Sequence, residues 1–322
     1  MKKVLFLAPR LDVMFKEGSV PAERGAIPAV RMPWHNLRTM VCEEHRRRGD
    51  DVRVLELPLW QFTPQIVQAI APDIAYIPHK MVDNFPVPNV NVMYYMQTVI
   101  PYLFTIDSKG WGASTSTYPC TSMLDGDTTG VGYNLLRGRI FENYSKFKQP
   151  DHKPITLPKD YVLYLCQIPH DETIRYHSKI TVEQAIMATC QATKELGIPL
   201  VLKGHPVNPG SMEQLKQIAN KYGHTTWLDD VSIHQLIPDA RAVVVVNSGT
   251  GLESLLHQRP VITFGRADYD VVTNRVEGGN LRELLEKPKF NQEAVKNFVD
   301  RWYDSCYNTI ANADNGSFSK LP

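Results

Sequence analysis

The feature that most constrains the fold is a regular alternation of short apolar runs with longer helical stretches, which continues along most of the 322 residues. Most runs are continuous and rich in β-branched residues, as is typical of parallel strands covered on both faces. The predicted strands are residues 4–8, 52–57, 74–77, 90–95, 161–166, 199–203, 242–246 and 260–264. The predicted helices between them are residues 36–48, 64–70, 181–196, 211–222, 233–238 and 252–257. This alternation predicts an α/β fold with open, doubly wound sheets.

The alternation is interrupted between about residues 107 and 158, where a segment rich in Gly, Ser, Thr and Pro precedes a linker-like stretch. We therefore predict two domains, 1–155 and 156–322, in keeping with a length about twice that of a usual domain. Both are expected to be Rossmann-like and to face each other across a cleft, in a GT-B-like arrangement. A last helix at 292–310 carries an aromatic face and is expected to pack back onto the protein.

Charge and cysteine content exclude several classes of protein. The formal net charge is +1, with 35 Lys and Arg against 34 Asp and Glu, so no global field attracts nucleic acid. No apolar run is long enough to form a transmembrane segment, which leaves peripheral membrane contact open. The five cysteines contain no close pair, which argues against a zinc knuckle or a disulfide framework and favours a reduced, cytoplasmic location.

Three predicted strands of the second domain end in polar, turn-forming clusters. These clusters are Gln167-Ile168-Pro169-His170-Asp171-Glu172, Lys203-Gly204-His205-Pro206 and Asn247-Ser248-Gly249-Thr250-Gly251-Leu252-Glu253. Ligands of open α/β sheets bind beyond the carboxyl ends of the strands, where loops and helix N-termini converge. Each cluster alone is explained by an ordinary turn, but the three together predict a ligand site.

The third cluster is the sharpest of these signals. Gly249 and Gly251 allow close approach of the backbone, and the N–H groups that open the next helix suit a phosphate, with hydroxyls from Ser248 and Thr250. Glu253 is one helical turn further on, where its carboxylate is placed to accept hydrogen bonds from a ribose diol. The alternative is an ordinary helix N-cap, by the Asn247 or Ser248 side chain, without a ligand.

Two familiar nucleotide-binding motifs do not fit. The sequence contains no Gly-Lys-Ser/Thr, which excludes a P-loop. The segment 249–254 resembles a dinucleotide fingerprint, but it has Ser254 in place of the third glycine and occurs late in the chain. A nicotinamide dehydrogenase is therefore disfavoured.

The other two clusters supply candidate chemical groups. His205 precedes Pro206, which biases its backbone away from helix, and its imidazole is placed to bind a phosphate or a base beside the countercharge of Lys203. Asp171, aligned with Gln167, is the candidate catalytic carboxylate. Its alternative role is the N-cap of a following helix.

In the first domain, Asp107 ends an apolar run and is followed by a glycine turn with Trp111, a side chain able to stack on a sugar ring. Its alternative role is to start that turn. One carboxylate from each domain at a shared cleft would resemble the pairs that catalyse glycosyl chemistry. The Asp125-Gly126-Asp127 triplet has the form of a metal signature, but it is in a loop and we do not interpret it as a metal site.

Taken in order and spacing, these residues resemble the capsular polysaccharide biosynthesis family, the KpsC/KpsS-like Kdo transferases. The resemblance covers about residues 161–270. It rests on Gln167-x-x-x-Asp171, Lys203-x-His205-Pro206, Asn247-Ser248-x-x-Gly251-x-Glu253 and Arg259-Pro260-Val261-Ile262-Thr263-Phe264-Gly265-Arg266. In the first half, only Ile106-Asp107-Ser108-Lys109-Gly110-Trp111 is similar to the family's segment of an acidic residue followed by glycine.

The resemblance implies a GT-B fold with the nucleotide in the C-terminal domain, and a CMP-linked sugar, typically CMP-Kdo, as donor. It implies contacts of His205 and Pro206 with CMP, of Ser248 and Thr250 with the phosphate, and a catalytic role for Asp171. The sequence departs from the family at Gly249-Thr250, where Ser/Thr-Val is expected, and at Asp107, where glutamate is usual.

The leading hypothesis is a glycosyltransferase that needs no metal and no cofactor besides a nucleotide-sugar donor, and that transfers Kdo or a related acidic sugar to a glycan or glycolipid in surface polysaccharide assembly. The first alternative is a nucleotide-sugar epimerase or hydrolase on the same scaffold. The second is a non-catalytic protein that binds nucleotides or glycans.

Overall fold

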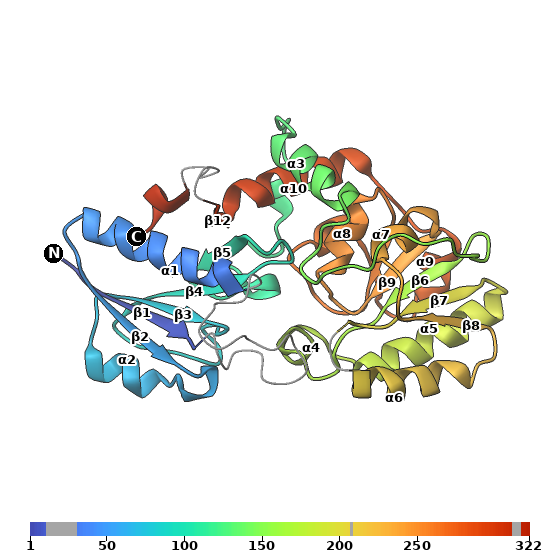
Figure 1. Ribbon diagram of the computed structural model, residues 1–322, viewed down its shortest axis with the longest axis horizontal. Coiled ribbons are helices and arrows are strands. Elements are labelled where there is room, and N and C mark those ends of the chain that lie inside the picture. Colours follow the sequence, from blue (N-terminus) through green and yellow to red (C-terminus); the bar gives the residue numbers. More distant parts are fainter. Residues whose placement is uncertain (11–30, 207–208, 311–316) are drawn as a thin grey trace. The chain divides into compact units, whose positions relative to one another are not determined.

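The computed structural model describes residues 1–10, 31–206, 209–310 and 317–322, and they form two units. Unit 1 comprises Met1–Tyr118 with Trp302–Pro322, and unit 2 comprises Pro119–Arg301. Each unit is built on one six-stranded sheet with helices packed against it (Figure 1). The predicted α/β class with two Rossmann-like sheets is thus confirmed.

The sheet of unit 1 has the strand order β12-β5-β4-β3-β1-β2. Its strands are β1 (Lys3–Pro9), β2 (Asp51–Leu57), β3 (Ile74–Pro78), β4 (Asn91–Gln97), β5 (Leu103–Asp107) and β12 (Tyr307–Asn308). The first four are parallel, whereas β5 is antiparallel to β4 and β12 is antiparallel to β5. Helices α1 (Met32–Arg47) and α2 (Pro64–Ile70) follow β1 and β2.

The sheet of unit 2 is entirely parallel within the described residues and has the order β11-β10-β9-β6-β7-β8. Its strands are β6 (Val162–Leu165), β7 (Leu200–Lys203), β8 (Thr225–Leu228), β9 (Ala242–Val245), β10 (Val261–Thr263) and β11 (Asn274–Arg275). Counted from β6, this is the 3-2-1-4-5-6 order of dinucleotide-binding folds. The strand order reverses between β6 and β9, so the switch point of this sheet lies there.

The helices of unit 2 precede these strands, connect them or follow the last of them. They are α3 (Val131–Phe141), α4 (Glu172–His177), α5 (Val182–Leu196), α6 (Pro209–Asn220), α7 (Ile233–Leu236), α8 (Thr250–Leu256), α9 (Leu281–Glu286) and α10 (Gln292–Ser305), the last of which crosses into unit 1. No helix among the described residues is long and apolar enough to cross a bilayer.

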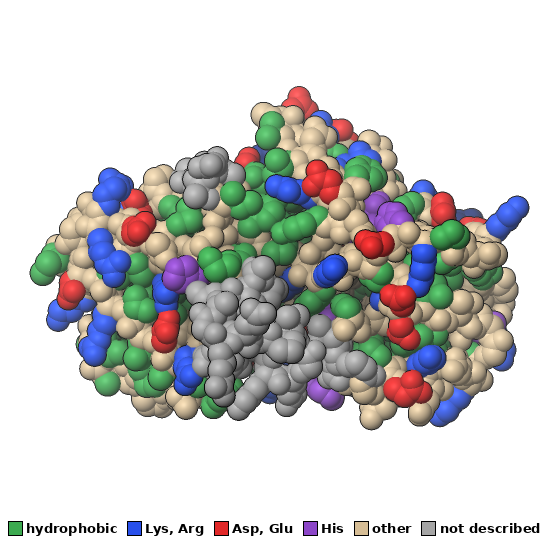
Figure 2. Space-filling model, in the orientation of Figure 1, with side chains coloured by type: hydrophobic (Ala, Val, Ile, Leu, Met, Phe, Trp, Pro, Cys, Tyr) green, Lys and Arg blue, Asp and Glu red, His purple; other side chains and the backbone are tan. Residues whose placement is uncertain are grey.

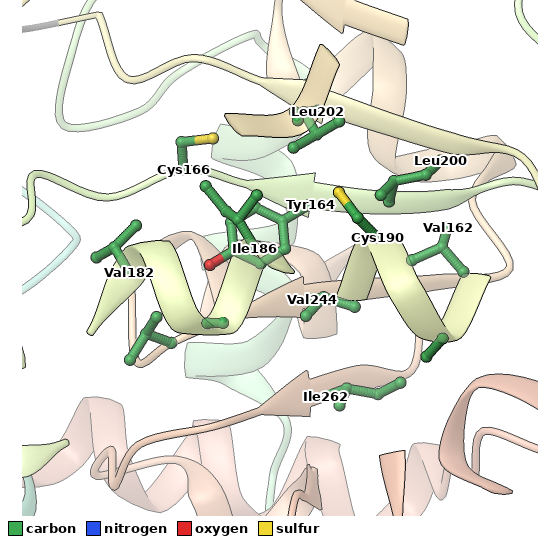
Figure 3. Close-up of a cluster of buried hydrophobic side chains, with 14 of the residues drawn as sticks. Val162, Tyr164, Cys166, Val182, Ile186, Cys190, Leu200, Leu202, Val244 and Ile262 are labelled. Atoms are coloured by element: carbon green, nitrogen blue, oxygen red, sulfur yellow. The ribbon is translucent and has the colours of Figure 1, made fainter. Parts of the chain in front are cut away.

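Helix α5 shows how the sequence fixes one layer of unit 2. Thr181 and Gln184 form a capping box at its start, and Gly197 ends it in the left-handed conformation that glycine adopts without strain. Its apolar face, which includes Ile186 and Cys190, packs on side chains of the strands such as Tyr164 (Figure 3). These residues are fully buried, so the helix is held by its apolar face against the sheet.

The division into units differs from the predicted one at 155/156. Residues 119–155 group with unit 2, and the chain from Trp302 onward groups with unit 1, where β12 extends the sheet. A carboxylate explains the first difference: Asp300 of α10 accepts hydrogen bonds from the N–H groups of Gly130 (2.9 Å) and Gly132 (2.7 Å), which open α3. The predicted helix 292–310 ends at Ser305 because the following residues form β12.

The surface carries both signs of charge in close mixture. On the face drawn in Figure 2, Lys and Arg side chains are interspersed with Asp and Glu side chains over both units. This pattern agrees with the formal net charge of +1.

Candidate functional site

The three polar clusters predicted from the sequence lie at one edge of the unit 2 sheet. Strands β9, β6 and β7 are neighbours and run parallel, with Leu165 of β6 opposite Lys203 of β7 and Tyr164 opposite Val244 of β9. Their carboxyl ends therefore emerge together, on both sides of the switch point. This is the position at which open α/β sheets bind ligands.

Gln167 and Asn247 join the two strand ends across the switch point. Gln167 Nε2 donates to Asn247 Oδ1 (3.0 Å), and the Asn247 backbone N–H donates to Gln167 Oε1 (2.9 Å). Asn247 Nδ2 also donates to the carbonyl of Thr173 in α4 (2.8 Å). Both side chains are buried, so they form the frame of the edge instead of offering free donors.

The strand β10 contributes to the same edge through Gly265. Its backbone N–H donates to the Val246 carbonyl (2.8 Å), and a Cβ at this position would lie 3.0 Å from both Asn247 Nδ2 and the His177 carbonyl oxygen. Glycine therefore suits the close packing around the Asn247 amide, where a Cβ would press on its neighbours.

The turn after Asn247 satisfies much of its own hydrogen bonding. Ser248 Oγ accepts from the Thr250 N–H (3.3 Å) and the Thr250 hydroxyl (2.9 Å), while the Gly251 N–H donates to the Ser248 carbonyl (2.9 Å). Gly249 has helical dihedral angles at the N-cap of α8. The N-cap of α8 is therefore Gly249, without a side-chain cap, and neither Asn247 nor Ser248 has the N-cap role that the alternative interpretation expected.

The close approach that Gly251 allows is made by Tyr269. A Cβ on Gly251 would collide with the Tyr269 ring, and the Tyr269 hydroxyl donates to the Ser248 carbonyl. The sequence predicted this glycine as an approach for phosphate. In the structure, an aromatic side chain occupies that space.

Glu253 is almost fully enclosed, with 1% of its surface exposed. Burial raises the pKa of its carboxyl to about 8, and the nearby Ser145 hydroxyl and Lys146 ammonium lower the pKa by less. Neither carboxyl oxygen has a hydrogen-bond partner of good geometry in the described part of the chain. At neutral pH the group is mainly protonated, which does not fit the predicted role of an open acceptor for a ribose diol.

Lys203 is also turned inward. Its ammonium donates to the carbonyl of Gly204 (2.8 Å), and burial lowers its pKa while the carboxylate of Asp229 raises it. The positive charge that the sequence predicted for a phosphate is thus already directed at protein groups.

His205 and Pro206 lie where β7 ends. His205 is half-buried and Pro206 is exposed. The His205 backbone N–H points to Met212 Sδ (3.1 Å), and its ring meets the ring of Phe147 edge to face, with centroids 5.2 Å apart. The imidazole is therefore positioned by an aromatic residue from outside the three clusters.

Asp171 is exposed and caps α4. Its Oδ1 accepts from the Thr173 N–H (2.8 Å) and from the Thr173 hydroxyl (2.8 Å). The alternative N-cap role is thus observed. This cap uses one carboxylate oxygen of Asp171, so the second oxygen is available to take part in a reaction.

Asp107, in unit 1, has a different environment. It is opposite Tyr94 at the end of β5, and because β5 is antiparallel to β4, its chain leads away from the carboxyl ends of the parallel strands. Its oxygens accept from the N–H groups of Lys109, Gly110 and Ser116, at 2.7–3.2 Å, and from the Ser116 hydroxyl. This is the turn-starting alternative. Trp111, expected to stack on sugar, is buried.

Sequence reasoning missed the segment 144–147, which crosses the same edge. The Tyr144 carbonyl is 3.1 Å from His234 Nε2, and Ser145 and Lys146 are close to Glu253. Phe147 contacts His205. The only sequence signal is a basic residue between aromatic ones just before the predicted linker, which is too weak to identify a site without the fold.

The residues described contain no cluster of His, Cys, Asp or Glu side chains that could hold a metal ion. A hollow of about 250 Å³ lies at the opposite edge of the unit 2 sheet, next to Asp160, Pro199 and Arg241, which precede β6, β7 and β9. It lies at the amino ends of the strands and brings together none of the predicted site residues.

Comparison with known proteins agrees with these features. Residues 132–278 match the family model described as capsule polysaccharide biosynthesis protein. A stretch of 125 residues is 28% identical to the capsule polysaccharide export protein KpsS of Escherichia coli. That alignment covers 36% of this chain and 32% of KpsS, so it spans about a third of that relative's length.

Two solved structures resemble nearly the whole chain. They are the β-Kdo 2,7-transferase and the β-Kdo 2,4-transferase of Thermosulfurimonas dismutans KpsC, with TM-scores of 0.54 and 0.53 and sequence identities of 16% and 13%. They cover 92% and 93% of this chain, and 90% of each of those chains. At such identities the likeness shows the fold, and it confirms the predicted GT-B-like class. The predicted resemblance to the KpsC/KpsS-like capsular polysaccharide biosynthesis family is therefore confirmed, with residues 132–278 as the part that the family model matches.

Proposed function

We propose that this protein is a glycosyltransferase of surface polysaccharide assembly, which transfers Kdo or a related acidic sugar from a CMP donor to a glycan or glycolipid acceptor. The observation that carries this proposal is the edge of unit 2, where the Gln167–Asn247 bridge spans the switch point with Asp171 and His205 beside it. The family match over this same region supports it.

The proposed reaction at this edge needs two kinds of protein group, one for the leaving group and one for the reacting atoms. A CMP leaving group has one phosphate, so protein cations and hydrogen-bond donors, His205 among them, can stabilise its charge without a divalent ion. Asp171 acts on the anomeric carbon or on the acceptor hydroxyl, through the oxygen that does not cap α4. Because nucleotide-activated sugars are supplied in the cytoplasm, we place the reaction there.

A thermal-shift screen over CMP, UDP, GDP and NAD tests the donor class. We expect CMP to raise the melting temperature by a few degrees and NAD to leave it unchanged, with a smaller effect of CMP on His205→Ala. Stabilisation by NAD alone would overturn the proposal. Donor consumption that needs no acceptor would instead indicate an epimerase or hydrolase, and nucleotide binding with no turnover would indicate a binding protein.

A further inference from the structure

Two lysines, Lys146 and Lys203, belong to the edge of the unit 2 sheet where the candidate site is found. Their ammonium groups differ in what they contact. Lys203 is buried at the end of β7, and its ammonium donates to the Gly204 carbonyl (2.8 Å) beside the carboxylate of Asp229. Lys146 comes from the segment between α3 and β6. Within the described ranges, its ammonium forms neither an ion pair nor a hydrogen bond. Lys146 is therefore the cation of the two that remains available to a ligand.

The position of Lys146 is fixed by its neighbours on both sides. Asn143 Oδ1 accepts from the Ser232 hydroxyl (2.5 Å), and Gln149 Oε1 accepts from the Ile233 N–H (3.1 Å), which attaches this segment to the start of α7. Phe147 rests against the His205 ring. The segment is thus tied down at several points around Lys146, so the lysine is held at the edge.

The carboxyl groups of Asp171 and Glu253 both interact electrostatically with the Lys146 ammonium. Burial lowers the pKa of Lys146, and these two carboxyl groups raise it, although neither is close enough to form an ion pair. Glu253 is mainly protonated at neutral pH, as described above, so it competes little for the ammonium. The charge of Lys146 is thus compensated only in part by the protein.

We propose that Lys146 is a binding residue of this site, and that its ammonium binds the phosphate of the nucleotide-sugar donor. The inference rests on the proposed function and adds the residue that supplies the countercharge. It moves this role from Lys203, which the sequence favoured, to a residue outside every recognised motif. A cation near Asp171 and the phosphate would also stabilise the charge that develops as the glycosidic bond breaks.

Calorimetry with CMP, with cytidine and with free Kdo, on the full chain, tests this role. The variants are Lys146→Met, Lys146→Arg and the control Lys148→Met, which removes an exposed lysine of the same segment. We expect Lys146→Met to weaken CMP binding about tenfold or more and to leave cytidine binding unchanged, because a charge-assisted contact to phosphate is lost. Lys146→Arg should recover part of the affinity, and Lys148→Met should bind both ligands as the wild type does.

Three outcomes would overturn the inference and leave the proposed function standing. They are CMP binding to Lys146→Met at wild-type strength, an equal loss for CMP and cytidine, and a loss for free Kdo without one for CMP, which would assign Lys146 to the sugar carboxylate. If the wild type binds another nucleotide in place of CMP, the proposed donor fails, and the same comparison of that nucleotide with its nucleoside decides the role of Lys146. A wild type that binds no nucleotide would overturn both.

Discussion

Asp107 of unit 1 and Asp171 of unit 2 are both acidic residues that follow an apolar run, and both start a turn. They differ in the strand that precedes them. Asp171 follows β6, whose neighbours run parallel and end in polar groups at the same edge, whereas Asp107 ends the antiparallel β5. Asp171 uses one oxygen in its cap, and Asp107 uses both in its loop. Strand direction therefore decides which carboxylate meets other functional groups.

The largest expected effect is that of Asp171→Asn on turnover. Asparagine also caps helices, so the variant should fold and bind CMP normally, while kcat falls by about 10²–10⁴-fold through loss of the reacting carboxylate. The measurement is consumption of a CMP-activated sugar, with Asp151→Asn as the exposed control. A kcat within twofold of wild type would remove Asp171 from catalysis.

Asp107→Asn is the matched change in the other unit. We expect little change in kcat and a loss of unfolding free energy of about 1–2 kcal/mol, because the Asp107 carboxylate holds the loop to Ser116. Denaturant unfolding and turnover should be measured on the same samples. A loss of turnover as large as that of Asp171→Asn would show that both carboxylates act in the reaction, as the sequence predicted.

Substitution of a third carboxylate, that of Asp300, tests why residues 119–155 group with unit 2. Asp300→Ala removes the acceptor for Gly130, Gly132 and the Thr129 hydroxyl at the start of α3, which should lower the unfolding free energy by about 2–4 kcal/mol. Amide exchange should rise most in α3. Equal exchange in α3 of the variant and of the wild type would contradict this account of why residues 119–155 group with unit 2.

The last expected effect, that of Glu253→Gln on stability, depends on pH and disappears in acid. The folded protein holds a proton on Glu253 up to about pH 8, whereas the unfolded chain releases it near the ordinary value of 4.5. Wild-type stability should therefore decrease as the pH rises through this window, and the glutamine variant should lack that decrease. We expect the variant and the wild type to be nearly equal in stability at pH 4.5, and the variant to be the more stable of the two by several kcal/mol at pH 8. Parallel pH profiles of the two proteins would contradict the burial of a protonated carboxyl.

Local patterns in the sequence were sufficient to predict much of the fold. The predicted helix 64–70 coincides with α2, and 181–196 differs from α5 by one residue, because capping residues and apolar periodicity act over a few residues. The short strands β11 and β12 were not predicted, since two residues carry too little pattern. β5 was seen as an apolar run, but its direction depends on a neighbouring strand.

For the candidate site too, one part was predictable from local sequence and another part was not. The sequence alone determined that polar clusters follow three strands of unit 2, since each cluster is contiguous and β-branched runs mark the strands before them. Only the tertiary structure decided what each side chain does there. Gln167 bonds to Asn247, and Gly251 accommodates Tyr269. Lys203 donates to the Gly204 carbonyl, and Lys146 belongs to the segment just before the predicted linker. The physical reason is that partners come from residues far apart in the chain, and local sequence does not encode the distances between them.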